Sequence, residues 1–327
     1  MLCLKEGKIP PELLKSLVFN NIKVKSKEVI MRPEIGEDCA AIDFGGHACV
    51  LSTDPITGAE KGAGTLAIHI SCNDVATCGV RPVGIMVTIL VPPTATEGDI
   101  GRVMKEAGEA AAALGVEIIG GHTEVTSAVN RIVISTTAVG KVLKDRIVRS
   151  SGAQTGDDVI MTKWAGLEGT SIIAADKEKV LADRLSQEEI EVAKSFIEHI
   201  SVVEEGVAAG EFGASSMHDV TEGGILGAAW EIAESSSKGI DIYIDEIPVH
   251  AVTRKLCYVF GIDPYRLISS GSMLITVKNG AELVRILEQK GIPAAIIGRI
   301  TEHDRNIIRD GETLILSPPD VDELFKA

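Results

Sequence analysis

Four aspartates stand in short polar segments that predict turns beside strands or helices: Asp38, Asp54, Asp74 and Asp219. Taken one at a time, an aspartate in such a segment is most simply a turn former or a helix cap. Taken together, carboxylates from several turns can supply the hard oxygen ligands that Mg²⁺ prefers, beside water and substrate phosphates. The sequence therefore predicts a metal site at these four residues, with Asp54 and Asp219 as candidate catalytic groups.

A second candidate is the run Gly120, Gly121, His122, Thr123 and Glu124, which follows a predicted strand. Two glycines let backbone N–H groups approach an anion without interference from a Cβ atom. The run matches neither the P-loop nor the dinucleotide-binding fingerprint. His122 is a candidate proton carrier or phosphate donor, and a merely solvated loop histidine is the alternative of equal weight.

The third candidate is residues 218–224, which read His-Asp-Val-Thr-Glu-Gly-Gly and precede a helix of small residues. The helix N-terminus and the amides of Gly223 and Gly224 predict an anion site next to Asp219, whose carboxylate could hold a metal. The simpler alternative is an N-capped helix with Glu222 in its first turn. The density of polar residues and glycines in this segment favours the functional interpretation.

Strands and helices alternate in the first half of the chain. Apolar spacing predicts a short helical arm at residues 10–18, and Thr96 with Asp99 three residues later predicts a capped helix start. The remaining expected elements are strands at 29–31, 40–42, 48–51, 83–91, 116–119 and 131–139 and helices at 65–78 and 96–114. This pattern predicts a mixed α+β domain.

A polar, glycine-containing stretch at residues 150–158 is the best candidate for a domain boundary. Because single cores rarely grow past ~250 to 300 residues, we expect two domains, residues 1–149 and 150–327. In the second domain the pattern predicts strands at 159–162, 240–244, 273–277 and 313–316 and helical stretches across 187–210 and 225–234.

The net charge limits the classes of partner. The chain carries 47 acidic and 32 basic residues, a net charge of −15. Nucleic acids and anionic membranes are bound by clustered Lys and Arg, so neither is an expected partner. An acidic protein that binds a phosphorylated ligand needs its carboxylates masked, and a divalent metal is the usual means.

Six cysteines occur without a C-x-x-C pair or a histidine ladder, at Cys3, Cys39, Cys49, Cys72, Cys78 and Cys257. We expect them to be reduced and mostly buried. No apolar stretch reaches the ~18 residues of a membrane span, and residues 1–22 lack the apolar core of a signal peptide. The expected compartment is the cytoplasm.

Seven segments, taken in order, resemble the AIR synthase (PurM-like) superfamily. The last two, His-Asp-Val-Thr-Glu-Gly-Gly and Ile-Ser-Ser-Gly-Ser-Met-Leu-Ile, are most similar to its HypE hydrogenase-maturation family. The other segments are Gly-Glu-Asp-Cys-Ala-Ala at 36–41, Ser-Thr-Asp-Pro-Ile at 52–56, Asn-Asp-Val-Ala at 73–76 continuing to Gly79 and Arg81-Pro82, Gly-Gly-His-Thr-Glu at 120–124 and the segment 162–169.

The resemblance implies a two-domain PurM-like fold, in which N-terminal domains share a β-barrel across a homodimer and the C-terminal domain packs a sheet with helices. It implies ATP in the cleft between the domains and Mg²⁺ at the four aspartates. Asn73, Lys163 and the glycine segments then become candidate nucleotide contacts. Such enzymes phosphorylate an amide-like oxygen and use metal to neutralise the developing charge.

One departure from HypE proteins is at the tail. They end in a Pro-Arg-Ile-Cys type segment whose cysteine carries the carbamoyl group, whereas this sequence ends Phe325-Lys326-Ala327 with no cysteine after Cys257. We therefore expect a HypE-like ATP- and Mg²⁺-dependent enzyme acting on an amide or carbamoyl oxygen of a small substrate, or one with another carrier, with a maturation factor as a protein partner. The alternatives are a non-catalytic ATP-binding partner in hydrogenase maturation or metabolism, and an AIR synthase or thiamine-phosphate kinase-like activity.

Overall fold

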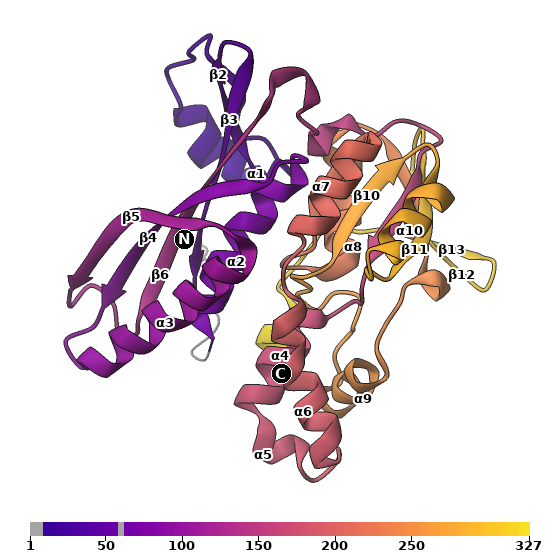
Figure 1. The fold of residues 1–327 in the computed structure, drawn as a ribbon. Coiled ribbons are helices and arrows are strands. Elements are labelled where there is room, and N and C mark those ends of the chain that lie inside the picture. The colour runs from indigo at the N-terminus through magenta and orange to yellow at the C-terminus, as the bar shows by residue number, and fades with distance from the viewer. Residues whose placement is uncertain (1–8, 58–61) are drawn as a thin grey trace.

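The computed structural model describes residues 9–57 and 62–327. It contains a six-stranded sheet from the first half of the chain and a seven-stranded sheet from the second half, and these stand side by side (Figure 1). Helix α2 (Ala63–Thr77) packs on the first sheet and also contacts α7 (Val203–Phe212) of the second half. The two-domain PurM-like α+β architecture expected from the sequence is confirmed, while a division at residues 149 and 150 stays a prediction.

The first sheet has the strand order β1-β2-β3-β6-β4-β5, and only the β4–β5 pair is parallel. Every second residue is buried along β3 from Ala48 to Ser52 and along β6 from Ile134 to Gly140, because one face of the sheet is covered by α2 and α3 (Glu97–Leu114). The strands are β1 Val29–Met31, β2 Ala40–Phe44, β3 His47–Ile56, β4 Pro82–Val91, β5 Glu117–Val125 and β6 Val133–Leu143.

Helix α3 begins and ends as the sequence predicts. Thr96 accepts a hydrogen bond from the Asp99 amide and the Asp99 carboxylate accepts one from the Thr96 amide, so the capping box is confirmed. Gly115 ends the helix in the left-handed conformation. Helix α2 is buried on almost every side, and a Cβ atom added to Gly206 of α7 would come within 2.3 Å of the Ala76 carbonyl oxygen. Small residues thus let the two halves approach closely.

The second sheet has the strand order β13-β12-β9-β11-β7-β10-β8, and only β9 and β12 are parallel. Every residue of β8 and β10 is buried. Strand β10 lies between β7 and β8, and the edge strand β8 is covered by contacts with α2 of the first half. The strands are β7 Asp158–Thr162, β8 Ser216–Asp219, β9 Gly239–Tyr243, β10 Met273–Val277, β11 Ala294–Thr301, β12 Arg305–Arg309 and β13 Glu312–Ile315.

Short helical segments fill the rest of the described chain. The N-terminal arm consists of α1 Pro11–Leu13, η1 Leu14–Val18 and η2 Phe19–Asn21. The other α-helices are α4 Leu167–Asp176, α5 Glu178–Leu181, α6 Gln187–Ser195, α8 Gly224–Ser235, α9 Ala251–Phe260 and α10 Gly280–Gln289. The remaining turns of 3₁₀ helix are η3 Lys144–Arg146, η4 Ser150–Gly152, η5 Phe196–His199, η6 Ile244–Glu246 and η7 Glu323–Lys326.

Two sequence expectations about local structure are wrong. The helical stretch expected across 187–210 is broken into α6, η5 and α7, because the Asn73 side chain bonds the backbone between them, at Ile200 O and Val202 N. The loop expected at residues 120–124 lies inside strand β5. Gly121 has φ 150°, and a Cβ atom there would lie 1.8 Å from the Val87 carbonyl oxygen, so the glycine serves a close strand approach.

The cysteine expectation agrees with the structure where it can be compared. The described cysteines are free, and Cys39, Cys72, Cys78 and Cys257 are buried while Cys49 is half-buried. Cys3 lies outside the described residues. Within the described ranges no helix combines the length and the apolar character that crossing a membrane requires.

Candidate active site

The four predicted aspartates line one cavity of about 960 Å³. Asp38 comes from the turn before β2, Asp54 from β3, Asp74 from α2 and Asp219 from the end of β8. The cavity therefore draws its carboxylates from both halves of the chain, although these residues are up to 181 positions apart in the sequence. Leu13 and Leu14 of the N-terminal arm and residues 319–322 and 324–325 near the C-terminus also line it.

Asp74 lies at the centre of this group and is only 4% exposed. Its Oδ2 accepts a hydrogen bond from the Ser52 hydroxyl at 2.5 Å. Burial raises the pKa of Asp74 well above its usual range, and the nearby charges of Asp219, Asp54 and Asp38 raise it further. Carboxylates this close repel one another unless a proton or a cation lies among them.

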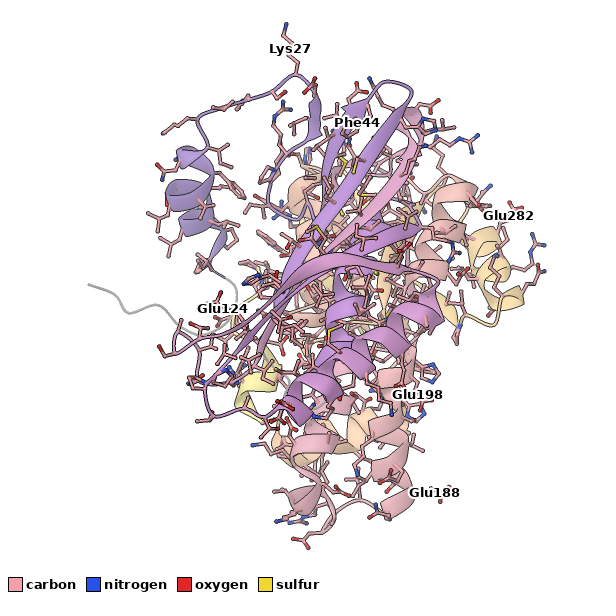
Figure 2. The ribbon with its side chains drawn as sticks, turned by 60° about the vertical axis from the view of Figure 1, so that its left-hand side comes forward. Lys27, Phe44, Glu124, Glu188, Glu198 and Glu282 are labelled. Atoms are coloured by element: carbon pink, nitrogen blue, oxygen red, sulfur yellow. The ribbon has the colours of Figure 1, made fainter. Side chains whose placement is uncertain are left out.

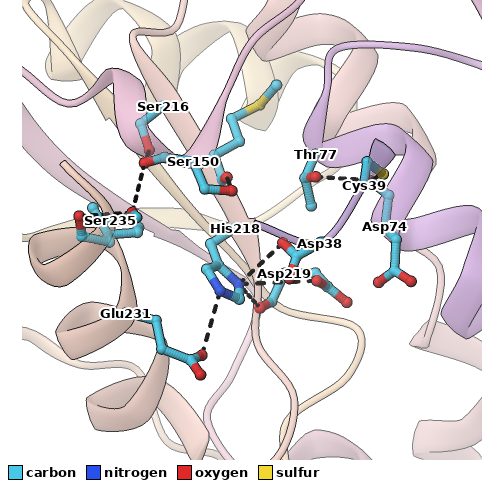
Figure 3. Close-up of polar contacts among 12 residues, drawn as sticks. Asp38, Cys39, Asp74, Thr77, Ser150, Ser216, His218, Asp219, Glu231 and Ser235 are labelled. Carbon is cyan, nitrogen blue, oxygen red and sulfur yellow. Dashed lines mark hydrogen bonds and ion pairs between the residues drawn. The ribbon is translucent and has the colours of Figure 1, made fainter. Parts of the chain in front are cut away.

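His218 is the buried cationic group beside this cluster (Figure 3). Its Nδ1 lies 3.4 Å from Asp38 Oδ2 and 4.0 Å from Asp219 Oδ1, and its Nε2 lies 3.3 Å from Glu231 Oε2. Burial lowers the pKa of the imidazole, but Asp38, Glu231 and Asp219 outweigh it and bring the pKa to about 10. A protonated His218 therefore ties the Asp38 turn of the first half to α8 of the second.

A divalent cation fits the donor set of this cavity. One ligand atom each from Asp38, His218 and Asp219 lies within 4.8 Å of the others. An imidazolium has no lone pair to offer, so with His218 protonated the ligands left are carboxylate oxygens, which Mg²⁺ prefers. The repulsion that raises the pKa of Asp74 is the electrostatic reason for a cation here.

Asn73 and Lys163, both predicted nucleotide contacts, make internal contacts. The Asn73 amide bonds the backbone at residues 200 and 202. Lys163 is buried, has φ 55°, and donates from Nζ to the carbonyls of His199 at 3.1 Å and Gly271 at 2.9 Å. The same Nζ reaches Ser201 O and Glu205 Oε1, each at 2.5 Å. These contacts join separate segments of the second half, and the predicted role in nucleotide binding stays a prediction.

The residues predicted at 120–123 lie apart from the aspartate cluster within one chain. Asp54 pairs with Thr136, Thr136 with Val87, and Val87 with Gly121. Three strand spacings place Gly121 ~14 Å from Asp54 across the sheet. Gly120, Gly121, His122 and Thr123 are exposed on the edge strand β5, and His122 Nε2 lies 3.1 Å from Glu124 Oε2 at the outer side of the molecule (Figure 2).

Gly223 and Gly224 form the start of helix α8, as predicted. The Gly223 amide donates to Asp322 Oδ2 at 2.7 Å, and the amides of Ile268 and Leu324 donate to Asp322 Oδ1 at 3.2 and 2.8 Å. A carboxylate of the chain thus lies at the anion-binding helix start. It connects the C-terminal segment to the wall of the cavity.

Family models identify the group of proteins to which the chain belongs. The model of the AIR synthase related protein N-terminal domain matches residues 36–142, and that of the C-terminal domain matches residues 154–311. The chain belongs to the AIR synthase-related family. The family assignment made from the ordered motifs is therefore confirmed.

Within the AIR synthase-related family the chain is similar to hydrogenase-maturation proteins. It is 28% identical over 311 residues to a hydrogenase expression/formation protein of Methanocaldococcus jannaschii, covering 92% of this chain and 90% of that protein. It is 28% identical over 285 residues to carbamoyl dehydratase HypE of Rhizobium leguminosarum, covering 84% and 79% of the two chains.

Solved structures of HypE proteins share the fold. The chain resembles one in a HypE–HypF complex with a TM-score of 0.77 at 23% identity, covering 94% of this chain and 99% of that one. It resembles a HypE in complex with ATP with a TM-score of 0.69 at 22% identity, covering 98% and 97%. At these identities the likeness establishes the AIR synthase-related fold of this chain.

The structure adds polar residues to the cavity that the sequence analysis did not single out. His218 and Glu231 flank the aspartates, and Glu168 and Ser270 lie on the wall of the second half. His218 stands next to Asp219 in the segment 218–224, so its position in the sequence could have indicated that it belongs to the site. Glu168 lies in the segment 162–169, which was noted for its family resemblance, but its residue type and spacing there gave no reason to select it.

Glu168 provides a test of the electrostatics of this wall. Burial raises its pKa to about 7, with further increases from Asp322 and Glu222 and an opposing effect of Ser270. From pH 4.5 to pH 7 the folded chain keeps a proton that the unfolded chain releases, so Glu168 lowers stability as pH rises through this window. Glu168→Gln removes that loss, and we expect it to stabilise the protein by up to ~3 kcal/mol at pH 8 and much less at pH 5.

Thermal unfolding at both pH values measures this effect. The matched control is Glu188→Gln, because Glu188 is an exposed glutamate of α6 (Figure 2). Equal stabilisation by Glu168→Gln at pH 5 and pH 8 would contradict the raised pKa.

Proposed function

We propose that this protein is a HypE-like, ATP- and Mg²⁺-dependent enzyme that phosphorylates the oxygen of an amide or carbamoyl group on a small substrate. The observation that carries the proposal is the convergence of Asp38, Asp54, Asp74 and Asp219 on one cavity between the two halves of the chain. Similarity to carbamoyl dehydratases and to a HypE in complex with ATP supports the choice of reaction and nucleotide.

Each part of the cavity has a task in this proposal. Mg²⁺, when bound at the carboxylates of Asp38, Asp54, Asp74 and Asp219, would neutralise charge on the ATP phosphates during transfer. His218 holds Asp38 and Asp219 in place through their ion pairs, so the ligands of two separate elements are oriented before ATP arrives. The arm residues and the C-terminal segment that line the cavity would limit the access of water, which otherwise competes for the phosphoryl group.

The fate of ATP tests the proposed function. The protein is incubated with Mg²⁺ and ATP and with small carbamoyl, formyl-amide and phosphorylated compounds, and nucleotides and products are followed by mass spectrometry. We expect ADP to form together with a phosphorylated or dehydrated carbamoyl compound. Calorimetry with ATP is run beside it, and failure of the wild type to bind ATP with Mg²⁺ would overturn the proposal.

We also propose that two chains form a homodimer through the open face of the first sheet, closing it into a shared barrel. Val83 and Met86 of β4 are 58% and 48% exposed, and Ile119 and Val125 of the edge strand β5 are exposed beside them. An exposed apolar face next to an unpaired strand edge is a typical association surface. In such a dimer the residues at 120–123 of one chain could lie at the cavity of the partner chain. Within their own chain Gly121 lies ~14 Å from Asp54 of the cavity.

Met86→Glu tests the dimer. A charge at the centre of this face would have to be desolvated on association, so we expect the variant to sediment as a monomer at concentrations where the wild type is a dimer. Analytical ultracentrifugation measures this, with Tyr258→Glu as the control, because Tyr258 is exposed on α9 and away from the first sheet. A monomeric wild type would contradict the proposed interface.

A maturation-factor protein is the expected partner. A HypE structure similar to this chain was solved in complex with HypF, which supports a partner of that type. The partner would deliver the carbamoyl group that the proposed reaction consumes. Co-elution of the two purified proteins on size-exclusion chromatography tests this part.

A further inference from the structure

Two cysteine thiols lie in contact beside the aspartate cluster. Cys39 directly follows Asp38 in the segment before β2, and Cys78 caps the C-terminal end of α2. Their side chains are in hydrogen-bonding contact, although the two residues are 39 positions apart in the sequence. Both belong to the same buried apolar cluster, and they are only 5% and 1% exposed. Two separate elements of the first half thus bring their sulfur atoms together.

The Cys39 thiol is also bonded to the helix that carries a second metal-binding candidate. Its Sγ donates to the backbone carbonyl of Asp74 at 3.1 Å, and the Thr77 hydroxyl donates to the same oxygen at 2.7 Å (Figure 3). Cys78 directly follows Thr77 at the end of this helix. A change in the bonding of Cys39 therefore acts on Asp74 and on Asp38, its neighbour in the chain.

The two thiols differ in their access to small molecules. Cys39 lines the cavity of about 960 Å³, whereas Cys78 is not one of the described residues that line it. Burial raises the pKa of the Cys39 thiol well above its usual range, and the contact with Cys78 and the charges of Asp74 and Asp38 raise it further. Because the thiolate is the reactive form, exchange at Cys39 is slow, and long equilibration is needed to establish the redox state of the pair.

We propose that Cys39 and Cys78 form a reversible disulfide that lowers the affinity of the aspartate cluster for Mg²⁺ with ATP. The S–S bond removes the hydrogen that Cys39 donates to the Asp74 carbonyl. It also draws the two sulfur atoms to about 2.05 Å, and with them the segment of Asp38 towards the end of α2. Mg²⁺ demands near-ideal octahedral geometry, so displaced carboxylates bind it less well. The effect on Mg²⁺ and ATP rests on the proposed function, whereas formation of the disulfide does not.

A small disulfide such as oxidised glutathione is the electron acceptor. The Cys39 thiol loses its proton to the buffer, its sulfur attacks one sulfur of glutathione disulfide, and that S–S bond breaks with its electron pair on the leaving thiolate. Cys78 then loses its proton, and its sulfur attacks the Cys39 sulfur of the mixed disulfide and releases the second thiolate. The two released thiolates take up two protons, so two protein thiols are oxidised and one disulfide is reduced.

Peptide mapping tests the disulfide. The folded wild type is equilibrated with oxidised glutathione, the remaining thiols are alkylated in denaturant, and the digest is analysed by mass spectrometry. We expect a pair of peptides linked through Cys39 and Cys78, which dithiothreitol separates. A protein that keeps both thiols free, or that carries only glutathione on Cys39, would overturn the proposal.

Calorimetry with Mg²⁺ and ATP measures the effect on the site. We expect the oxidised wild type to bind ATP at least ~10-fold more weakly than the reduced wild type, which lies in the usual range of coupling between two sites. Dithiothreitol should restore binding. Cys78→Ala should bind equally before and after treatment with glutathione disulfide. Cys257→Ala is the matched control, because it removes a buried thiol of α9 and should respond like the wild type.

The outcomes separate the disulfide from the proposed function. Oxidised wild type that contains the linked peptides and binds ATP like the reduced protein would overturn the effect on the site. An equal loss of binding in Cys78→Ala would assign the effect to another thiol and overturn the role of the pair. Reduced wild type that binds no ATP with Mg²⁺ would instead overturn the proposed function, while peptide mapping still decides whether the disulfide forms.

Discussion

Asp219→Asn is expected to reduce Mg²⁺-dependent ATP turnover by at least ~10²-fold, the size of effect that loss of one group stabilising transition-state charge produces. The carboxylate of Asp219 is fully buried at the end of β8 and lies in the cavity with Asp38, Asp54 and Asp74. An amide in its place keeps the shape but offers a neutral oxygen to the metal. The proposed binding of the metal therefore requires the negative charge of Asp219, which asparagine lacks.

The same substitution should leave the metal-free protein at least as stable as the wild type. Asp219 is the strongest of the charges that raise the pKa of Asp74, so removing it relieves repulsion inside the cluster. Addition of Mg²⁺ with ATP should raise the melting temperature of the wild type, because ligands stabilise the state that they bind. The variant should show little of that rise.

Thermal scans with and without Mg²⁺ and ATP check both parts. Asp245→Asn is the matched control, since Asp245 is exposed in η6 and distant in sequence from the cavity-lining segments. Full turnover in Asp219→Asn, or a ligand-induced rise equal to that of the wild type, would show that the carboxylate cluster is not the metal site.

Lys163→Met is expected to destabilise the protein by ~3 to 5 kcal/mol, the range measured when one partner of a buried ion pair is removed. The Lys163 ammonium lies against Glu205, and in the variant the Glu205 carboxylate would gain no replacement donor from water, because this site is buried. Three backbone carbonyls also lose their donor. Chemical denaturation should show a lower midpoint for the variant.

The double variant Lys163→Met/Glu205→Met separates the two causes of this loss. Replacing both charges with apolar side chains of similar volume removes the uncompensated carboxylate, so we expect a substantial part of the stability to return. The loss of stability that remains in the double variant measures the cost of leaving the three backbone carbonyls without their donor. A single variant as stable as the wild type would contradict the stabilising role of the Lys163 contacts. A double variant no more stable than the single one would assign the loss to the three carbonyls that lose their donor.

Much of the architecture was predictable because it depends on local patterns. Alternating burial defined β3 and β6, and Thr96 with Asp99 defined the start of α3, since caps and strand periodicity depend only on neighbouring residues. The break in the helical stretch at 200–202 was not predictable. It depends on the side chain of Asn73, which is 127 and 129 residues away from the two backbone atoms that it bonds.

The candidate site divides in the same way. Asp38, Asp54, Asp74 and Asp219 could be selected from the sequence by their residue type and polar neighbours. The expectation that all four lie in turns is wrong, because Asp54 lies in strand β3 and Asp74 lies in helix α2. Glu168 could not be selected, because an ordinary glutamate in a first helical turn becomes unusual only when burial removes its water.

The sequence by itself determined the family, the fold class and the four metal-binding candidates, all of which follow from residue type and local order. Only the tertiary structure decided that the aspartates share one cavity and that residues 120–123 lie on an edge strand. It also decided that Lys163 donates its hydrogen bonds to backbone carbonyls and forms an ion pair with Glu205. The physical reason is that distance, burial and strand register are set by packing between segments far apart in the chain, and electrostatic effects follow from those three quantities.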